Sequence, residues 1–309
     1  MGSNAAGPQE RADAALEPPA ILGPSAGGIP LASGRLRRSR PGGSTPGNSA
    51  PSGVARDAAW RIALPLLAGL LAALAWQLEL FHRLFGLRTY QLPLPSTIAA
   101  AIRDNAALLL DYAAYTLGEA ALGLLAGAVA GFGLALAATA WPRWGAPGIV
   151  LAAAVNAVPI VALAPIMNLW FGGGIGSRVA IVAVGSMAAV AIQAHKGMRS
   201  VDPLALDLLH GYAASRRDVF LRLRIPASLP YLATAMKIGT TASMIGAIVG
   251  EFFFSSKGLG YLLSNSIKVA KMPLGWSCIV IAAVAGILFY LITERLERTL
   301  IRWHPSQRG

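Results

Sequence analysis

Residues 202–226 read DPLALDLLHGYAASRRDVFLRLRIP and lie between two long apolar segments of the chain. The leucines and aromatic residues of this stretch recur at the spacing of a helix. Ser215 can cap a helix with its hydroxyl group, and Asp218, three residues later, is a favourable acid in a first helical turn. The stretch therefore predicts two short amphipathic helices joined near residues 211–215.

The rest of the chain is too apolar for a water-soluble globule. Of its 309 residues, 55% are hydrophobic and 13% are charged, and the mean hydropathy is +0.57. Ordinary soluble proteins carry about 25% charged residues. A net charge of +12 would suggest nucleic-acid binding in a soluble protein, but here the basic residues flank apolar segments, as they do in membrane proteins. The single cysteine, Cys278, excludes an internal disulfide framework and, with four scattered histidines, a zinc cluster.

Six apolar segments match or approach the roughly 20 helical residues that cross a bilayer core of about 30 Å. They are residues 62–80, 117–140, 149–171, 179–194, 232–254 and 276–292. Pro159 and Pro165 predict a bend within the third span. The expected fold is all-α: a polytopic membrane domain of about six transmembrane helices over residues 59–305, preceded by a disordered basic tail at 1–58.

The lysines and arginines predict the orientation of these spans. If the N-terminus lies inside, most of the 26 basic residues fall in cytoplasmic segments, where positive charges are retained. Six crossings put both termini on one side, so the number of spans and the charge bias agree. Both termini and the loop 197–228 are therefore expected to be cytoplasmic.

This loop resembles that of the inner-membrane permease subunits of ABC importers, in the nitrate, sulfonate and taurine branch. The family's loop carries Glu-Ala-Ala, a glycine six residues after the glutamate, and later an aliphatic residue followed by proline. Here Asp207 takes the place of the glutamate, Leu208-Leu209 of the alanines, Ala213 of the glycine, and Ile225-Pro226 of the last pair. Gly211 is expected to take over the flexible position of the missing glycine.

Segments outside the loop resemble the same branch in the same order. They are Leu94-Pro95-Ser96, Trp170-Phe171-Gly172, Gly250-Glu251-Phe252-Phe253 and Gly258-Leu259-Gly260-Tyr261-Leu262. The resemblance covers residues 60–303. It implies the type I ABC importer permease fold, in the inner membrane of a bacterium.

The resemblance also implies partners. Two copies of the chain would form the pathway through the lipid bilayer, the loop would dock on a cytoplasmic ATPase subunit, and a periplasmic binding protein would deliver the solute. ATP would be bound by the ATPase, so the chain itself needs no cofactor. The expected solute is a small anion such as a sulfonate, taurine or nitrate, or else a pyrimidine-type vitamin precursor.

Particular loop residues are expected to carry the coupling to the ATPase. These are Asp207, Leu208, Leu209, Gly211, Tyr212, Ala213, Ser215, Arg216, Phe220, Ile225 and Pro226. We expect Asp207 and Ala213 in the core of the helix pair. Tyr212, Arg216 and Phe220 are candidates for contacts with the partner, although the two aromatic residues can equally pack the loop against the bundle.

The sequence holds no motif for ATP hydrolysis or other catalysis. The run Gly172-Gly173-Gly174-Ile175-Gly176-Ser177-Arg178 is rich in glycine but lacks the lysine of a phosphate-binding loop. No Ser/His/Asp set, paired membrane carboxylates or metal-ligand spacing in the sequence suggests catalysis. The chain is therefore predicted not to be an enzyme, and no metal or nucleic-acid site is expected.

Polar residues inside the apolar segments are the other candidate sites, because charge in hydrocarbon is costly. Asn156 and Asn168 can line a polar pathway or join helices by hydrogen bonds. Lys237 is expected to extend to the inner interface, and Glu251 to reach the outer interface or to serve an outer gate. His195 is expected at the inner boundary.

A self-sufficient secondary transporter or channel is the alternative function. It would use Lys237, Glu251 and His195 as ion relays. The duplicated pair of broken helices that many secondary transporters show is missing from the sequence, which favours the importer.

Overall fold

The computed structural model describes residues 52–300, and this part of the chain is helical with no strand. Its helices are α1 Ser52–Gln77, α2 Leu80–Phe85, α3 Pro95–Asp104, α4 Ala106–Ala140, α5 Pro142–Asn156, α6 Ile160–Phe171, α7 Ile175–Arg199, α8 Pro203–Gly211, α9 Arg216–Val219, the π-helical turn η1 Phe220–Arg224, α10 Ile225–Phe254, α11 Leu259–Lys268 and α12 Met272–Leu300. Helix α1 begins at Ser52, inside the predicted tail 1–58. Residues 1–51 of that tail lie outside the described residues, as do residues 301–309 at the other end of the chain.

Four helical stretches in the described chain are long and apolar enough to cross a membrane. They are α4, α7, the continuous stretch Arg216–Phe254 and Met272–Thr299 of α12. Helices α5 and α6 would together make a fifth span. Helix α1 has 26 residues, and the apolar part of it whose side chains are described is Ala63–Gln77. The described residues thus hold four such stretches, or five with the bent pair, and the first of the six predicted spans, residues 62–80, falls mostly on α1.

The bend predicted within the third span is present, and it is a complete break between the helices α5 and α6. The two helices meet at an angle of 101°. Pro159 has no amide hydrogen and takes an extended conformation before α6, and the residue preceding a proline avoids the helical region. The amides of Ala157 and Val158 instead close a tight last turn on Ala154 and Val155. The proline therefore ends one helix and starts another.

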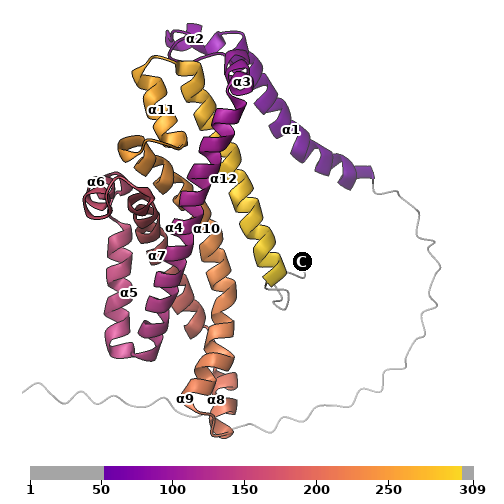
Figure 1. Ribbon diagram of the computed structural model, residues 1–309. Helices are drawn as coiled ribbons and strands as arrows, with labels where there is room; N and C mark the ends of the chain where they lie inside the picture. Colours follow the sequence, from indigo (N-terminus) through magenta and orange to yellow (C-terminus); the bar gives the residue numbers. More distant parts are fainter. Residues whose placement is uncertain (1–51, 301–309) are drawn as a thin grey trace, which may run out of the picture. The chain divides into compact units, whose positions relative to one another are not determined.

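Helices α4, α7 and α10 lie side by side and form the centre of the bundle (Figure 1). Gly123, Gly127 and Gly131 of α4 face α7, as their spacing of four residues predicts, because a Cβ at each would run into α7. Gly246 of α10 also faces α7, because a Cβ there would lie 3.3 Å from the side chain of Val182. The small side chains let these three helices approach closely.

Replacing Gly131 with alanine should destabilise the bundle by about 1–3 kcal/mol, the usual cost of overpacking. The new Cβ would lie 3.0 Å from the backbone nitrogen of Ala191, and closer still to the Met187 carbonyl oxygen. Gly133→Ala is the matched control, since nothing lies within 4 Å of a Cβ there. Thermal unfolding of the two variants in detergent measures the difference. Equal unfolding temperatures would show that α4 and α7 are not in close contact.

Candidate functional site

The segment after α7 has capped helix ends. The N-cap of α8 is Asp202, whose carboxylate accepts a hydrogen bond from the Leu204 amide at 2.9 Å. Ser215 caps α9, as predicted: the Asp218 amide donates to its hydroxyl oxygen at 3.2 Å, and the hydroxyl donates to the Asp218 carboxylate at 2.5 Å. These caps fix where each helix begins.

The turn between α8 and α9 depends on Ala213. Its φ angle is +52°, in the left-handed region that favours glycine, while Gly211 is the last residue of α8 and does not have a positive φ. The amides of Ala213 and Ala214 donate to the carbonyls of His210 and Leu209 at 2.9 and 3.0 Å. The expectation that Gly211 would take over the flexible position was wrong, because Ala213 itself adopts the strained conformation.

Ala213→Gly should stabilise the protein by about 0.5–1 kcal/mol, since it relieves the strain of a left-handed alanine at a small entropic cost. Ala213→Val should destabilise it, because a branched side chain tolerates this conformation less well. Thermal unfolding of the purified chain tests both changes. If glycine lowered the unfolding temperature, the left-handed turn would be contradicted.

The second predicted short helix is not a separate helix. Helix α9 runs through the π-helical turn η1 directly into α10, and the Ile225 amide donates to the carbonyl of Phe220, five residues earlier. Pro226 has no amide hydrogen to offer the Arg222 carbonyl, so an ordinary helical turn cannot form there. The loop therefore connects without a break to the longest apolar stretch of the chain.

Helix α8 has no buried residue in the described chain. Its Asp207, like Ala213 in the turn, is exposed, so the prediction that these residues form the core of the helix pair was wrong. Leu204, Leu208 and Tyr212 are spaced by four and are 75%, 61% and 78% exposed. We call these three residues the α8 stripe.

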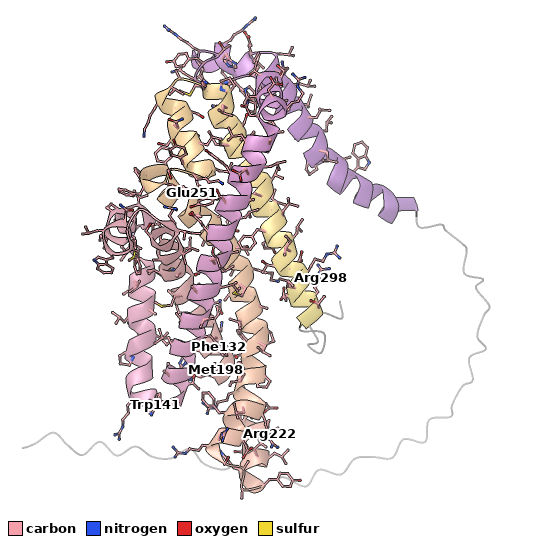
Figure 2. The ribbon with its side chains drawn as sticks, in the orientation of Figure 1. Phe132, Trp141, Met198, Arg222, Glu251 and Arg298 are labelled. Atoms are coloured by element: carbon pink, nitrogen blue, oxygen red, sulfur yellow. The ribbon has the colours of Figure 1, made fainter. Side chains whose placement is uncertain are left out.

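The base of the loop is packed tightly against the bundle. Phe220 is half-buried against a cluster that contains Ala194, Met198 and Phe132, of which the last two are labelled in Figure 2. Phe220 thus packs the loop, whereas Tyr212 and Arg216 stay exposed. Figure 2 also shows Arg222 at the α8–α9 end of the bundle and Glu251 far from it.

Glu251 is fully buried, which corrects the expectation that it reaches the outer interface. Its carboxylate accepts hydrogen bonds from the Thr116 hydroxyl at 3.0 Å and the Gly260 amide at 2.8 Å. Close to it, Glu119 pairs with Arg178 at 2.6 Å, with both side chains buried. The sequence analysis considered Arg178 only as the last residue of a glycine-rich run and did not predict this pair. A signal for this pair was present in the sequence. Arg178 directly precedes the apolar segment 179–194, and Glu119 is an acid inside the apolar segment 117–140.

Lys237 also has a partner that sequence reasoning missed. Its ammonium group lies 2.7 Å from the carboxylate of Glu297 and joins α10 to α12. His195, at the boundary of α7, lies 3.0 Å from the hydroxyl of Thr139. Neither contact connects to Glu251, so the structure does not assemble these three residues into one ion relay.

The two candidate pathway asparagines lie on different helices of the broken pair. Asn156 ends α5 and lines a small cavity of about 70 Å³ that α7 and α10 also border. Asn168 lies on α6, and its side-chain oxygen is buried without a hydrogen-bond partner. Asn156 is exposed, whereas the side-chain oxygen of Asn168 is buried, and a role of either residue in the pathway stays a prediction.

Taken together, these features define a class: a polytopic helical membrane protein with ion pairs inside its bundle and an exposed short helix, α8, at one end. Comparison with known proteins gives the family. The chain belongs to the binding-protein-dependent transport system inner membrane components, whose family model matches residues 123–302. This family provides the permease subunits of ABC importers, in which a separate subunit hydrolyses ATP.

Two relatives illustrate the similarity. The formylaminopyrimidine transport permease ThiX of Halalkalibacterium halodurans is 30% identical over 244 residues, which are 79% of this chain and 96% of ThiX. The taurine transport permease TauC of Escherichia coli is 27% identical over 147 residues, which are 48% of this chain and 54% of TauC.

Solved structures confirm the fold. A chain of the methionine ABC transporter MetNI in an inward-facing conformation superimposes with a TM-score of 0.56 at 15% identity, over 63% of this chain and 97% of the matched chain. A chain of an amino acid ABC transporter gives a TM-score of 0.54 at 16% identity. The predicted type I importer permease fold is thereby confirmed.

Proposed function

We propose that α8 and the turn after it form the docking surface for the ATPase subunit of this importer. The observation that carries the proposal is the α8 stripe, a row of large apolar side chains on a helix with no buried residue. Such a surface suits an apolar groove on a partner. Arg216 and Arg217 are exposed just beyond it and would meet acidic groups at the rim of that groove.

The two ends of the loop support a mechanical role. Gly197 at the end of α7 packs directly against Ser228 and Tyr231 of α10, and Phe220 packs on the cluster around Met198. A displacement of α8 would therefore be passed to α7 and α10, which lie at the centre of the bundle. Alternating access requires such a connection between an ATPase and the spans.

The arrangement in the membrane follows from this proposal. The α8 end would face the cytoplasm, with both chain termini on the same side, and the end near α2, α3 and α11 would receive the periplasmic binding protein (Figure 1). Two copies of the chain would form the pathway in a bacterial inner membrane. The basic residues beside the spans favour this orientation.

For the solute we propose a pyrimidine-type vitamin precursor. ThiX, named for formylaminopyrimidine, matches nearly its whole length. Arg178 is buried and paired with Glu119, and Lys237, which is 25% exposed, is paired with Glu297. A pathway without a spare positive charge suits an uncharged ring better than a sulfonate. The match to TauC keeps small sulfonates as the second candidate.

Reconstitution of the chain in lipid vesicles tests this function. Uptake should require the ATPase, ATP and the binding protein together, and the chain alone should transport nothing under an ion gradient. Uptake driven by a gradient through this chain alone would overturn the proposal and support a secondary transporter. Binding of pyrimidines, taurine and nitrate to the cognate binding protein separates the candidate solutes.

A further inference from the structure

Two buried carboxyl groups meet in the half of the bundle away from α8. Glu119 of α4 and Glu251 of α10 are both 0% exposed, and they are neighbours, because Thr116, one helical turn before Glu119, donates its hydroxyl hydrogen to Glu251 at 3.0 Å. We call these two residues the carboxyl pair. Its member Glu251 lies far from the α8–α9 end of the bundle (Figure 2).

One oxygen of each carboxyl group is fully engaged by donors. Glu119 Oε1 accepts from Arg178 Nε at 2.6 Å, and Glu251 Oε2 accepts from the Thr116 hydroxyl at 3.0 Å and the Gly260 amide at 2.8 Å. The other two oxygens, Glu119 Oε2 and Glu251 Oε1, are buried and receive no hydrogen bond. A buried carboxylate oxygen without a donor is costly, and here two occur together.

The charge around the carboxyl pair does not balance if both groups are ionised. Arg178, 3% exposed, supplies one positive charge against two negative ones. Its other N–H groups donate to the Tyr115 hydroxyl oxygen at 3.0 Å and the Gly173 carbonyl oxygen at 3.1 Å, not to Glu251.

Neighbouring elements do not supply the missing charge. Lys257 lies 5.4 Å from the Tyr115 ring but is partly exposed and pairs with Asp111 at 3.0 Å. Helix α11 contributes the backbone amide of Gly260. Among the charged side chains that the structure describes, no other one forms a hydrogen bond or ion pair with either carboxyl group, so an excess negative charge would remain buried.

The space beside the pair is closed by glycine backbone. Gly258 has a φ of +102°, and a Cβ built there would overlap the carboxyl group of Glu251, including its free oxygen. No group of three metal-ligating side chains occurs among the described residues. The ligand that fits between the two free oxygens must therefore be very small.

We propose that Glu119 and Glu251 bind one proton between them, which one carboxyl group donates to the free oxygen of the other. With Arg178, the cluster is then electrically neutral, and both free oxygens are satisfied. Two carboxylates in contact cannot both remain ionised in a buried site, and sharing a proton is the general solution. The proton joins α4 to α10, and α10 is one of the two helices that a displacement of α8 would move.

Infrared spectroscopy of the full chain, copurified with its ATPase subunit, tests this proposal at neutral pH. The wild type should show the carbonyl stretch of a protonated carboxyl group, and Glu251→Gln should lose one such group per chain. The amide of the substituted glutamine can donate to Glu119 and accept from Thr116, so the variant should accumulate in the membrane as the wild type does. Glu294→Gln, a half-buried glutamate on α12 paired with Arg298, is the matched control and should leave the band unchanged.

Three results would overturn the proposal. The first is a wild type without the band, which would mean that both groups are ionised around a water molecule. The second is a band that survives in Glu251→Gln and also in Glu119→Gln. The third is a Glu251→Gln chain that fails to accumulate in the membrane while Glu294→Gln accumulates normally.

Discussion

Replacing Arg178 with methionine should leave very little folded permease in the membrane. The Arg178 and Glu119 side chains are 3% and 0% exposed and lie 2.6 Å apart, so the change strands a buried negative charge. Removing one partner of a buried ion pair costs about 3–5 kcal/mol, a large part of the stability of an ordinary protein. Arg178 also holds the Tyr115 hydroxyl and the Gly173 carbonyl, and these contacts would be lost as well.

A second substitution separates the effect of charge from that of packing. Arg178→Met combined with Glu119→Gln removes both charges of the pair, and it should recover much of the folded protein. Arg103→Met is the matched control, because Arg103 and its partner Asp104 are 78% and 60% exposed and such pairs contribute about 0–1 kcal/mol. The amount of monodisperse protein after detergent extraction and its thermal unfolding provide the measurement. An Arg178→Met chain as stable as Arg103→Met would show that the pair is not buried in the membrane.

The sequence predicted the positions of the apolar spans well, because span length and hydropathy are properties of one segment at a time. It also predicted the helix faces of Gly123 and Gly127, since a spacing of four residues places them together on any helix. The Ser215 cap was predictable for the same reason: its partner Asp218 is only three residues away.

What the sequence did not predict depends on contacts between distant segments. Glu251 was expected at an interface, but its donors come from α4 and from the loop before α11, which no local pattern connects. The partner of Lys237 is Glu297, on another helix. Pro159 predicted a change of direction within the third span. The angle of 101° between α5 and α6 also depends on the packing of α6 against α7 and α10, which no local pattern predicts.

The turn itself was predicted, but the left-handed conformation of Ala213 within it was missed, for a different reason. A left-handed conformation at a residue other than glycine is rare, so the nearby Gly211 was the more probable candidate by its intrinsic preference. The hydrogen bonds from Ala213 and Ala214 back to α8 hold the alanine in place despite the strain. The spacing of the family motif, rather than the residue type, located the turn correctly.

Replacing Leu208 with glutamate should abolish ATP-driven uptake while leaving the permease folded. Leu208 is 61% exposed in the middle of the α8 stripe and has no buried neighbour on its own helix, so the bundle does not depend on it. At the centre of a docked apolar interface, a carboxylate would lose its hydration without gaining a partner, and such central positions carry most of the binding free energy. We expect at least a tenfold loss of affinity for the ATPase, which corresponds to about 1.4 kcal/mol.

The conservative variant Leu208→Met gives the control, since methionine keeps the apolar contact and nearly the same volume. Copurification of the ATPase with each variant should fall for glutamate and persist for methionine, and uptake into vesicles should follow the same order. The thermal unfolding of the isolated permease should be the same for both, because the side chain is exposed in the single chain. Normal uptake by Leu208→Glu would mean that the ATPase contacts another face of the loop, whereas loss of folded permease would mean that α8 packs against the bundle in the membrane.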